Sequence, residues 1–296
     1  MTITFHSRRL DGTWDKDSLQ PFSFPAGEAH IKIAEGFKLS DYDHFVADVR
    51  GHNPQDLFHL ALWENIVDSE GDVEENIFPE KTIFLPYIPA ARADRGLPFG
   101  AQVYTEFLHG LFIQNYIVID PHSPVALDLL RAGESTVIEF PFERIIKHSI
   151  QDKTSDSRPQ TYAGVIAPDH GAVDRATRAA NVMGVPVYRA GKTRDFETGQ
   201  LTGFHMEDEL PAEGRFLIVD DICDGGGTFN GLADAIGLDN TRLDLWVTHG
   251  VFSKGLEELG KRFGTIHTTD SYYTDSTPTS WVKVHSITSH FFGELR

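Results

Sequence analysis

The chain alternates short apolar, β-rich runs with segments of helical composition, and this alternation constrains its fold more than any other feature. Each apolar run ends in a polar or glycine-containing turn, and a helix-like segment follows. The clearest units are TIFLPYIPAARADRG, NYIVIDPHSP, YAGVIAPDHGAVDRATRAANVMG, RFLIVDDICDGGGTFNGLADAIG and LDLWVTHGVFSKGLEELG. Such alternation predicts parallel α/β units with right-handed crossovers, in which ligands bind beyond the carboxyl ends of the strands. We therefore expect the functional residues just after the apolar runs.

The length of 296 residues leaves room for about two domains. Apolar residues make up 40 % of the chain and charged residues 24 %, as in an ordinary folded protein. The polar stretch QDKTSDSRPQ, at 151–160, is the best candidate for a linker or surface loop near mid-chain. Both halves carry several strand-turn-helix units, which is consistent with a distant duplication.

Charge and cysteine content exclude several classes of protein. The net charge of −18 argues against a broad phosphate-binding surface of the kind that nucleic-acid-binding proteins carry. No segment approaches the run of about 18 apolar residues that indicates a membrane-spanning helix. The single cysteine, Cys223, cannot form an intramolecular disulfide, and the first residues lack the apolar core of a signal peptide. We expect a cytoplasmic protein with neither nucleic acid nor a membrane as its partner.

The stretch RFLIVDDICDGGGTF carries the most specific chemistry. Residues 216–219 indicate a buried strand and 228–236 the following helix, so DDICDGGG is predicted to form the turn between them. Glycines let backbone N–H groups approach an anion, and the amino end of the next helix adds to the attraction. The adjacent carboxylates would repel a bare phosphate but suit hydroxyl donors, so the sequence predicts a ribose 5-phosphate ligand. Cys223 is interpreted as a packed, structural residue.

Taken singly, such features also have ordinary structural explanations. A glycine cluster is often a solvated turn, and an isolated Lys-x-Arg pair is usually a solvated surface feature. A lone aromatic residue such as Phe24 more often packs in a core than binds a cofactor. A histidine after a strand is more often capped or packed than a ligand, and most of the histidines here lack zinc-like spacing. The order of the motifs along the whole chain has to decide between these structural explanations and a functional site.

LIVDDICDGGGT resembles the phosphoribosyl pyrophosphate motif of type I phosphoribosyltransferases and of ribose-phosphate diphosphokinases, the phosphoribosyl pyrophosphate synthetases. Other segments resemble only the synthetases, in the same order from about residue 20 to 270. They are FPAGEAHIKI, PYIPAARADRG, DPHSP, APDHGAVDRA, GKTRD and THGVFS. The resemblance implies an α/β fold of two similar domains, each a mainly parallel sheet flanked by helices. The expected domains are 1–144 and 145–280, with a segment 281–296 that packs back on the first domain.

The resemblance also implies the reaction. A synthetase transfers the β,γ-diphosphoryl group of ATP to the anomeric 1-hydroxyl of ribose 5-phosphate, with Mg²⁺, and releases AMP. Lys192 and Arg194 of GKTRD would supply positive charge from one mobile loop, and DFETGQLTG continues it as a lid. Asp169 would anchor the metal, and His122 would share the metal and contact the triphosphate. The nucleotide loop comes from a neighbouring subunit in the family, so a homodimer or hexamer is expected.

The remaining implied contacts divide between ATP and the acceptor. Phe24 would stack on adenine, Glu28 would lie close by, and Arg92, in the same segment as Asp94, would meet the phosphates. For the acceptor, carboxylates would bind the ribose hydroxyls or flank the entrance, and a glycine-rich loop would enclose the 5-phosphate. These residues are Asp220, Asp221, Asp224, Gly225, Gly226, Gly227 and Thr228.

Three positions depart from the family pattern. Gly225 replaces a threonine that would cap the phosphate, Ala26 replaces an acid or amide, and Ala93 replaces a glutamine. Each change removes polar atoms and opens space. Two acceptors therefore stay open, namely ribose 5-phosphate, and ADP-ribose as in phage-encoded relatives that rebuild NAD.

Two further classes of protein are weighed against these. A phosphoribosyltransferase would not need FPAGE, PYIPAARADRG or GKTRD. A catalytically silent, regulatory relative would have no reason to keep Lys192, Arg194, His122 and Asp169. Both alternatives are disfavoured by these residues.

Overall fold

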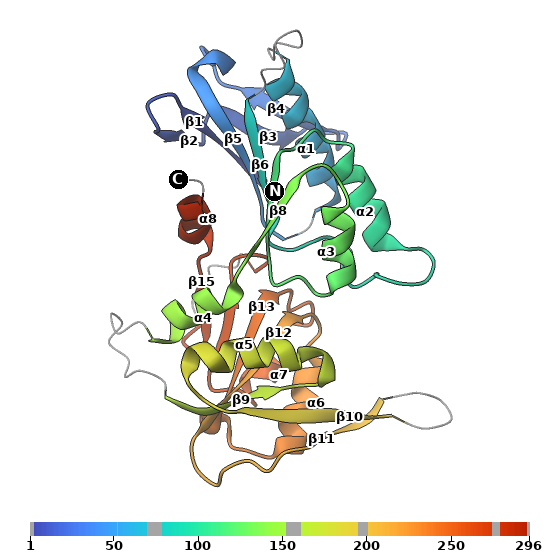
Figure 1. The fold of residues 1–296 in the computed structure, drawn as a ribbon, viewed down its shortest axis with the longest axis vertical. Coiled ribbons are helices and arrows are strands. Elements are labelled where there is room, and N and C mark those ends of the chain that lie inside the picture. The colour runs from blue at the N-terminus through green and yellow to red at the C-terminus, as the bar shows by residue number, and fades with distance from the viewer. Residues whose placement is uncertain are drawn as a thin grey trace. The chain divides into compact units, whose positions relative to one another are not determined.

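The structure is a computed structural model, and it describes residues 3–51, 53–69, 79–151, 161–194, 201–273 and 279–294. The chain forms two compact units, one of Met1–Phe140 with Gly293–Arg296 and one of Pro141–Phe292 (Figure 1). Each unit is described by itself. No helix in the described ranges is both long and apolar enough to cross a membrane.

The first unit contains a six-stranded sheet in the order β2-β1-β5-β6-β7-β8. Strands β5 to β8 are parallel, whereas β1 is antiparallel to both β2 and β5. A separate antiparallel pair, β3-β4, projects as a hairpin. The strands are β1 (Ile3–Arg9), β2 (Trp14–Asp15), β3 (Leu19–Ser23), β4 (Ala29–Ile33), β5 (Tyr42–Val49), β6 (Glu80–Phe84), β7 (Asn115–Ile119) and β8 (Thr136–Phe140). The helices are η1 (Leu39–Asp41), α1 (Pro54–Asp68), α2 (Gly100–His109) and α3 (Pro124–Arg131).

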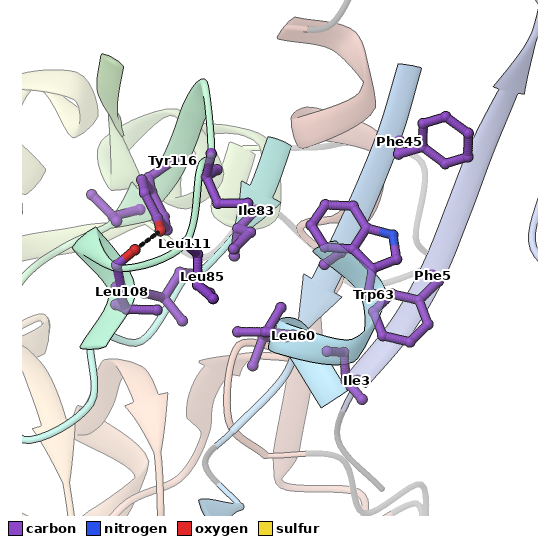
Figure 2. Packing of buried hydrophobic residues seen from close by; sticks show 14 of the residues in the cluster. Ile3, Phe5, Phe45, Leu60, Trp63, Ile83, Leu85, Leu108, Leu111 and Tyr116 are labelled. Atoms are coloured by element: carbon purple, nitrogen blue, oxygen red, sulfur yellow. Dashed lines mark hydrogen bonds between the residues drawn. The ribbon is translucent and has the colours of Figure 1, made fainter. Parts of the chain in front are cut away.

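The core of the first unit forms because its central strands are apolar on both faces. Almost every residue of β5 is buried, as expected for an inner strand covered on both sides. Trp63 of α1 stacks on Phe5 of β1, with ring centroids 5.8 Å apart (Figure 2). The hydroxyl of Tyr116, on β7, donates a hydrogen bond of 3.0 Å to the carbonyl of Leu108 on α2 (Figure 2). These contacts fix the helices against the sheet and so position the turns that follow β6 and β7.

The second unit contains a seven-stranded sheet in the order β11-β10-β9-β12-β13-β14-β15. All neighbours are parallel except β10 and β11. The strands are β9 (Tyr162–Ala167), β10 (Val187–Arg194), β11 (Leu201–Met206), β12 (Arg215–Cys223), β13 (Leu243–Gly250), β14 (Ile266–Thr269) and β15 (Val282–His285). The helices are α4 (Phe142–Gln151), η2 (His170–Ala172), α5 (Val173–Met183), α6 (Gly227–Ile236), η3 (Asn240–Arg242), α7 (Glu257–Gly260) and α8 (Thr288–Glu294).

The strand order of the second unit marks where a ligand would bind. From β9 the chain proceeds to β10 on one side, and later to β12 on the other side. The turns after β9 and β12 therefore lead away from each other, and in open α/β sheets ligands bind at the carboxyl ends of two such strands. Both turns carry acidic motifs that the sequence singles out, PDHG after β9 and DGGG after β12.

The predicted fold class is confirmed, because both units are mainly parallel sheets flanked by helices. The division into 1–144, 145–280 and 281–296 stays a prediction about separable domains. In the structure β15, at Val282–His285, extends the second sheet by pairing with β14. Of the predicted linker, Gln151 ends α4, and 152–160 lies outside the described residues.

Candidate functional site

Strand β12 is longer than the sequence predicts. It continues to Cys223, because β13 runs beside it as far as Gly250, the pairing partner of Cys223. Asp220 and Asp221 therefore lie within the last part of the strand and not in the turn, which corrects the expectation that DDICDGGG is one loop. Cys223 is fully buried, and burial raises the pKa of its thiol to about 12. Its interpretation as a packed residue is confirmed.

One arginine holds the two adjacent carboxylates of β12. Nη1 of Arg175, on α5, lies 3.2 Å from Oδ1 of Asp220 and 3.7 Å from Oδ1 of Asp221. Burial and the negative charge of Asp221 raise the pKa of the Asp220 carboxyl well above its ordinary value, and Arg175 opposes that rise. Residue-level reasoning missed Arg175, although the motif APDHGAVDRA contains it. Its spacing after Asp169 was the available signal.

The turn after β12 has the form of an anion site. We call residues 224–228 the glycine loop. Gly226 has φ 74°, a left-handed conformation that glycine adopts without strain. Helix α6 begins at Gly227, and among the described side chains none caps its amino end. Apart from the adjacent residues and the backbone of α6 itself, no described atom lies within 4 Å of the position of a Cβ added at Gly227. The exposed N–H groups of the first turn, with Thr228 beside them, are therefore open to a phosphate.

The rest of the glycine loop is in contact with the loop that follows β13. The carboxylate of Asp224 accepts a hydrogen bond of 2.5 Å from the hydroxyl of Ser253. A Cβ added at Gly225 would lie 3.2 Å from Cδ and Cε of Lys254. The sequence predicts open space at Gly225, and the structure corrects this, since the stem of Lys254 lies beside it.

The predicted catalytic lysine and the predicted metal anchor are in contact. Nζ of Lys192 lies 2.5 Å from Oδ2 of Asp169, whose other oxygen accepts from the Ala172 N–H at 3.2 Å. Lys192 belongs to β10, where it pairs with Phe204 of β11. The expectation of a loop at GKTRD is thus wrong as far as Arg194, because antiparallel pairing with β11 extends the strand.

Part of the predicted lid cannot be assigned. The backbone of Arg194 ends β10, and its side chain lies outside the described part of the chain. Residues 195–200 of the predicted lid also lie outside it, whereas 201–203 begin β11.

In the first unit, the predicted adenine-binding residues form the tip of the β3-β4 hairpin. The N–H of Phe24 donates to the carbonyl of Glu28 at 2.9 Å, and the N–H of Gly27 donates back to Phe24 at 2.8 Å. The ring of Phe24 is 47 % exposed and stacks on His30, with centroids 5.3 Å apart. The ordinary explanation of Phe24 as a core residue is therefore wrong, and one aromatic face is presented at a hairpin tip.

The other predicted ATP contacts follow β6 and β7. Arg92 is exposed and Asp94 is partly buried, with an Oδ1 3.8 Å from Nε of Arg95. His122 is exposed in the turn after β7, where Asp120 has a left-handed φ of 44°. These positions, on the first unit, match the strand-end placement that the sequence predicts.

The donor set fits magnesium better than a transition metal. Within the described ranges, no group of three or more His, Cys, Asp or Glu side chains could hold a metal ion. Mg²⁺ is usually bound by one or two carboxylates together with substrate phosphates, so a single anchor such as Asp169 is sufficient. Sharing of the metal by His122 stays a prediction.

A shallow hollow of about 600 Å³ lies elsewhere on the second unit. It is lined by residues 206–212 with Ala235, Ile236, Leu238 and Arg242. None of the predicted site residues lines it. The predicted site residues therefore lie near the strand ends and not in this hollow.

Comparison with curated proteins gives several relatives named ribose-phosphate pyrophosphokinase. No protein-family model matches the chain. The chain is 28 % identical over 269 residues to a ribose-phosphate pyrophosphokinase of Pyrococcus furiosus, covering 88 % of this chain and 87 % of the relative. A protein of the same name from Thermococcus kodakarensis is 27 % identical over the same shares of the two chains. One from Sulfolobus acidocaldarius is 28 % identical over 69 % of this chain and 66 % of the relative.

A solved structure supports the fold. The phosphoribosylpyrophosphate synthetase of Mycobacterium smegmatis superposes with a TM-score of 0.70 and 19 % identity, covering 95 % of this chain and 90 % of that one. The two chains therefore share their architecture over nearly their whole length.

Proposed function

We propose that this chain, a relative of the ribose-phosphate pyrophosphokinases over most of its length, is a transferase that moves the β,γ-diphosphoryl group of ATP to a ribose 5-phosphate moiety. The anomeric hydroxyl oxygen attacks the β-phosphorus and loses its proton. The bond from the β-phosphorus to the oxygen shared with the α-phosphate breaks, and AMP leaves with that oxygen. The observation that carries the proposal is the set of charged groups near the carboxyl ends of β9, β10 and β12, in a chain that is 28 % identical over 269 residues to a ribose-phosphate pyrophosphokinase.

The acceptor site of the proposal is the end of β12 with the glycine loop. Asp220 and Asp221 accept hydrogen bonds from the ribose hydroxyls, and Asp224 flanks the entrance. The N–H groups at the start of α6, with Thr228, bind the 5-phosphate. Arg175 is a positioning residue, because it holds both carboxylates and opposes the protonation of Asp220.

The chemical step requires alignment and positive charge more than covalent help. Lys192 and Arg194 supply that charge, and Asp169, which the family resemblance pairs with His122, would hold Mg²⁺ with the triphosphate. When bound, Mg²⁺ neutralises phosphate charge and orients the transferring group. Lys192, on β10, lies against Asp169, which follows β9, so both groups are at the same edge of the sheet.

ATP binding is assigned to the first unit. Phe24 stacks on adenine, with Glu28 nearby, and its exposed ring supports this role. The phosphates of ATP are contacted by Arg92, Asp94 and His122. A homodimer or hexamer is part of the proposal, with the hairpin of Phe24 contributed by a neighbouring subunit.

Incubation with Mg-ATP and an acceptor tests the function directly. With ribose 5-phosphate we expect release of AMP and a product heavier by one diphosphoryl group, identified by mass spectrometry. A protein that releases no AMP with any acceptor would be a silent relative with a regulatory role, and the proposed function would be wrong.

ADP-ribose is the second candidate acceptor, and the open space beside Gly227 favours it. A 5-phosphate that continues into a second phosphate and a nucleoside needs such an opening. The same assay with ADP-ribose, run beside ribose 5-phosphate, compares the two through kcat/KM. A product from ribose 5-phosphate alone excludes the larger acceptor.

A further inference from the structure

We propose that Lys254 binds the 5-phosphate of the acceptor and takes the place of the missing hydroxyl at Gly225. The inference rests on the proposed function, because it concerns the same phosphate. It assigns a specificity-determining residue that no motif of the sequence indicates.

The side chain of Lys254, in the loop after β13, lies beside the glycine loop. A Cβ added at Gly225 would lie 3.2 Å from both Cδ and Cε of Lys254 and 3.5 Å from its Cγ. The stem of the lysine therefore runs alongside the glycine loop, and its ammonium extends from that stem. This places a cation beside the amino end of α6, where the N–H groups already favour an anion.

The backbone does not explain why residue 225 is glycine. Unlike Gly226, Gly225 is outside the left-handed region, so a side chain would cause no backbone strain there. The nearest atoms that a Cβ would meet are those of Lys254 alone. A glycine at this position leaves room for the lysine stem, and we infer that the two residues act as a pair.

The loop of Lys254 is fixed to the glycine loop by its own backbone. The N–H groups of Val251 and Phe252 donate to the carbonyl of Cys223 at 2.9 and 3.0 Å, and the N–H of Ser253 donates to that of Asp224 at 3.1 Å. Phe252 has a left-handed φ of 47° yet is buried, so packing holds the turn in this form. The position of Lys254 is therefore set by hydrogen bonds to the residues that begin the glycine loop.

The charge of Lys254 is not neutralised by an acidic partner among the described residues. The ammonium of Lys254 forms no ion pair or hydrogen bond with any residue in the described ranges. By contrast Lys261, in the same region, lies 2.5 Å from Glu258. A lysine that lacks an acidic partner in a chain of net charge −18 is available to a phosphate.

The test measures the affinity of the intact protein for ribose 5-phosphate by calorimetry, and KM and kcat in the AMP-release assay. Lys254→Met keeps the stem and removes the charge. We expect its Kd and KM for ribose 5-phosphate to rise about tenfold, with a smaller change in kcat, since a phosphate contact acts on binding. The difference from wild type should shrink as salt is added. Lys261→Met is the matched control and should leave both constants unchanged.

The outcomes separate the two proposals. If Lys254→Met binds ribose 5-phosphate as tightly as wild type, Lys254 does not bind the phosphate, while the proposed function stands. If wild type does not bind ribose 5-phosphate and releases AMP with neither ribose 5-phosphate nor ADP-ribose, both proposals are wrong.

A double-mutant cycle tests the pairing of the two residues. Gly225→Thr with Lys254→Ala exchanges the ammonium for a hydroxyl and removes the stem that a Cβ would meet. We expect the double variant to bind ribose 5-phosphate more tightly than Lys254→Ala alone. Additive losses would contradict the inference that Gly225 makes room for Lys254.

Discussion

Arg175→Met should destabilise the second unit and impair acceptor binding together, and both effects should depend on pH. One guanidinium nitrogen lies 3.2 Å from Asp220 and 3.7 Å from Asp221, and all three side chains are largely buried. At an effective dielectric constant of about 20, the gross attraction across the shorter distance is roughly 5 kcal/mol. Removing one partner of a buried pair costs about 3–5 kcal/mol, because the remaining charges are left uncompensated.

The sign of the pH effect follows from Asp220. Its pKa is raised in the folded protein, first by burial and then by Asp221. Stability from such a group is fully present below the unfolded pKa, near 4, and is lost as pH rises through the folded pKa. Without Arg175 the folded pKa rises further, so the loss continues to higher pH. We expect Arg175→Met to lower the free energy of unfolding by about 3 kcal/mol near pH 8 and by much less near pH 4.

The assay is denaturant unfolding over a pH series, with acceptor KM measured over the range where the protein is folded. The pH profile of KM should shift upward, since the ionised carboxylate of Asp220 accepts hydroxyl hydrogen bonds more strongly than its protonated form. Arg178→Met is the matched control, one turn along α5, where the ion pair to Glu143 is more exposed. It should cost about 1 kcal/mol or less. An Arg175→Met protein as stable as wild type at every pH would refute the electrostatic argument.

Three further predictions concern separate parts of the second unit. Lys192→Ala should lower kcat about 100-fold while changing ATP affinity far less, because its charge is most useful in the transition state; equal losses in both, by kinetics and calorimetry, would contradict this role. Asp244 is fully buried and accepts from Tyr162 at 2.6 Å and from Arg215 at 2.5 Å. Asp244→Ala should therefore lower the free energy of unfolding by about 3–5 kcal/mol in denaturant titrations, with acceptor KM unchanged in the folded protein. Burial lowers the pKa of His285 to about 4, so its stability contribution is present above pH 6.5 and is lost as pH falls toward 4. That loss amounts to about 3 kcal/mol, and His285→Gln should flatten this part of the stability profile measured from pH 7 to 4.

Part of the candidate site was predictable because its signals are local. Three signals lie next to one another in the sequence: the apolar run before Asp220, the glycines at 225–227 and the helical composition after them. Each signal depends on the residues themselves, on the burial of a strand, on the backbone freedom of glycine or on helix propensity. The turn after β9 was predictable for the same reason, whereas local reasoning placed Phe24 in a core. The resemblance of the ordered segments then supplied the roles of these residues.

The two wrong predictions, the extent of the turn after β12 and the loop at GKTRD, arose where pairing between strands decides the structure. The end of β12 depends on how far β13 continues beside it, and the form of GKTRD depends on pairing with β11. The partner of β12 lies far along the chain, with Cys223 paired to Gly250, whereas the partner of β10 is the next strand, with Arg194 paired to Leu201. A hydrogen-bonded ladder can extend a strand through polar residues such as Asp220, which local composition assigns to a turn.

The sequence by itself determined the α/β class, the strand-end position of the motifs and the family resemblance, because periodicity and motif order are properties of the chain. Only the tertiary structure decided which groups meet. It brought Arg175 to the two carboxylates, Lys192 to Asp169 and Lys254 to Gly225, each from a different helix, strand or loop. The physical reason is that these contacts depend on the order and register of strands in the sheet, which are set by the packing of the whole unit.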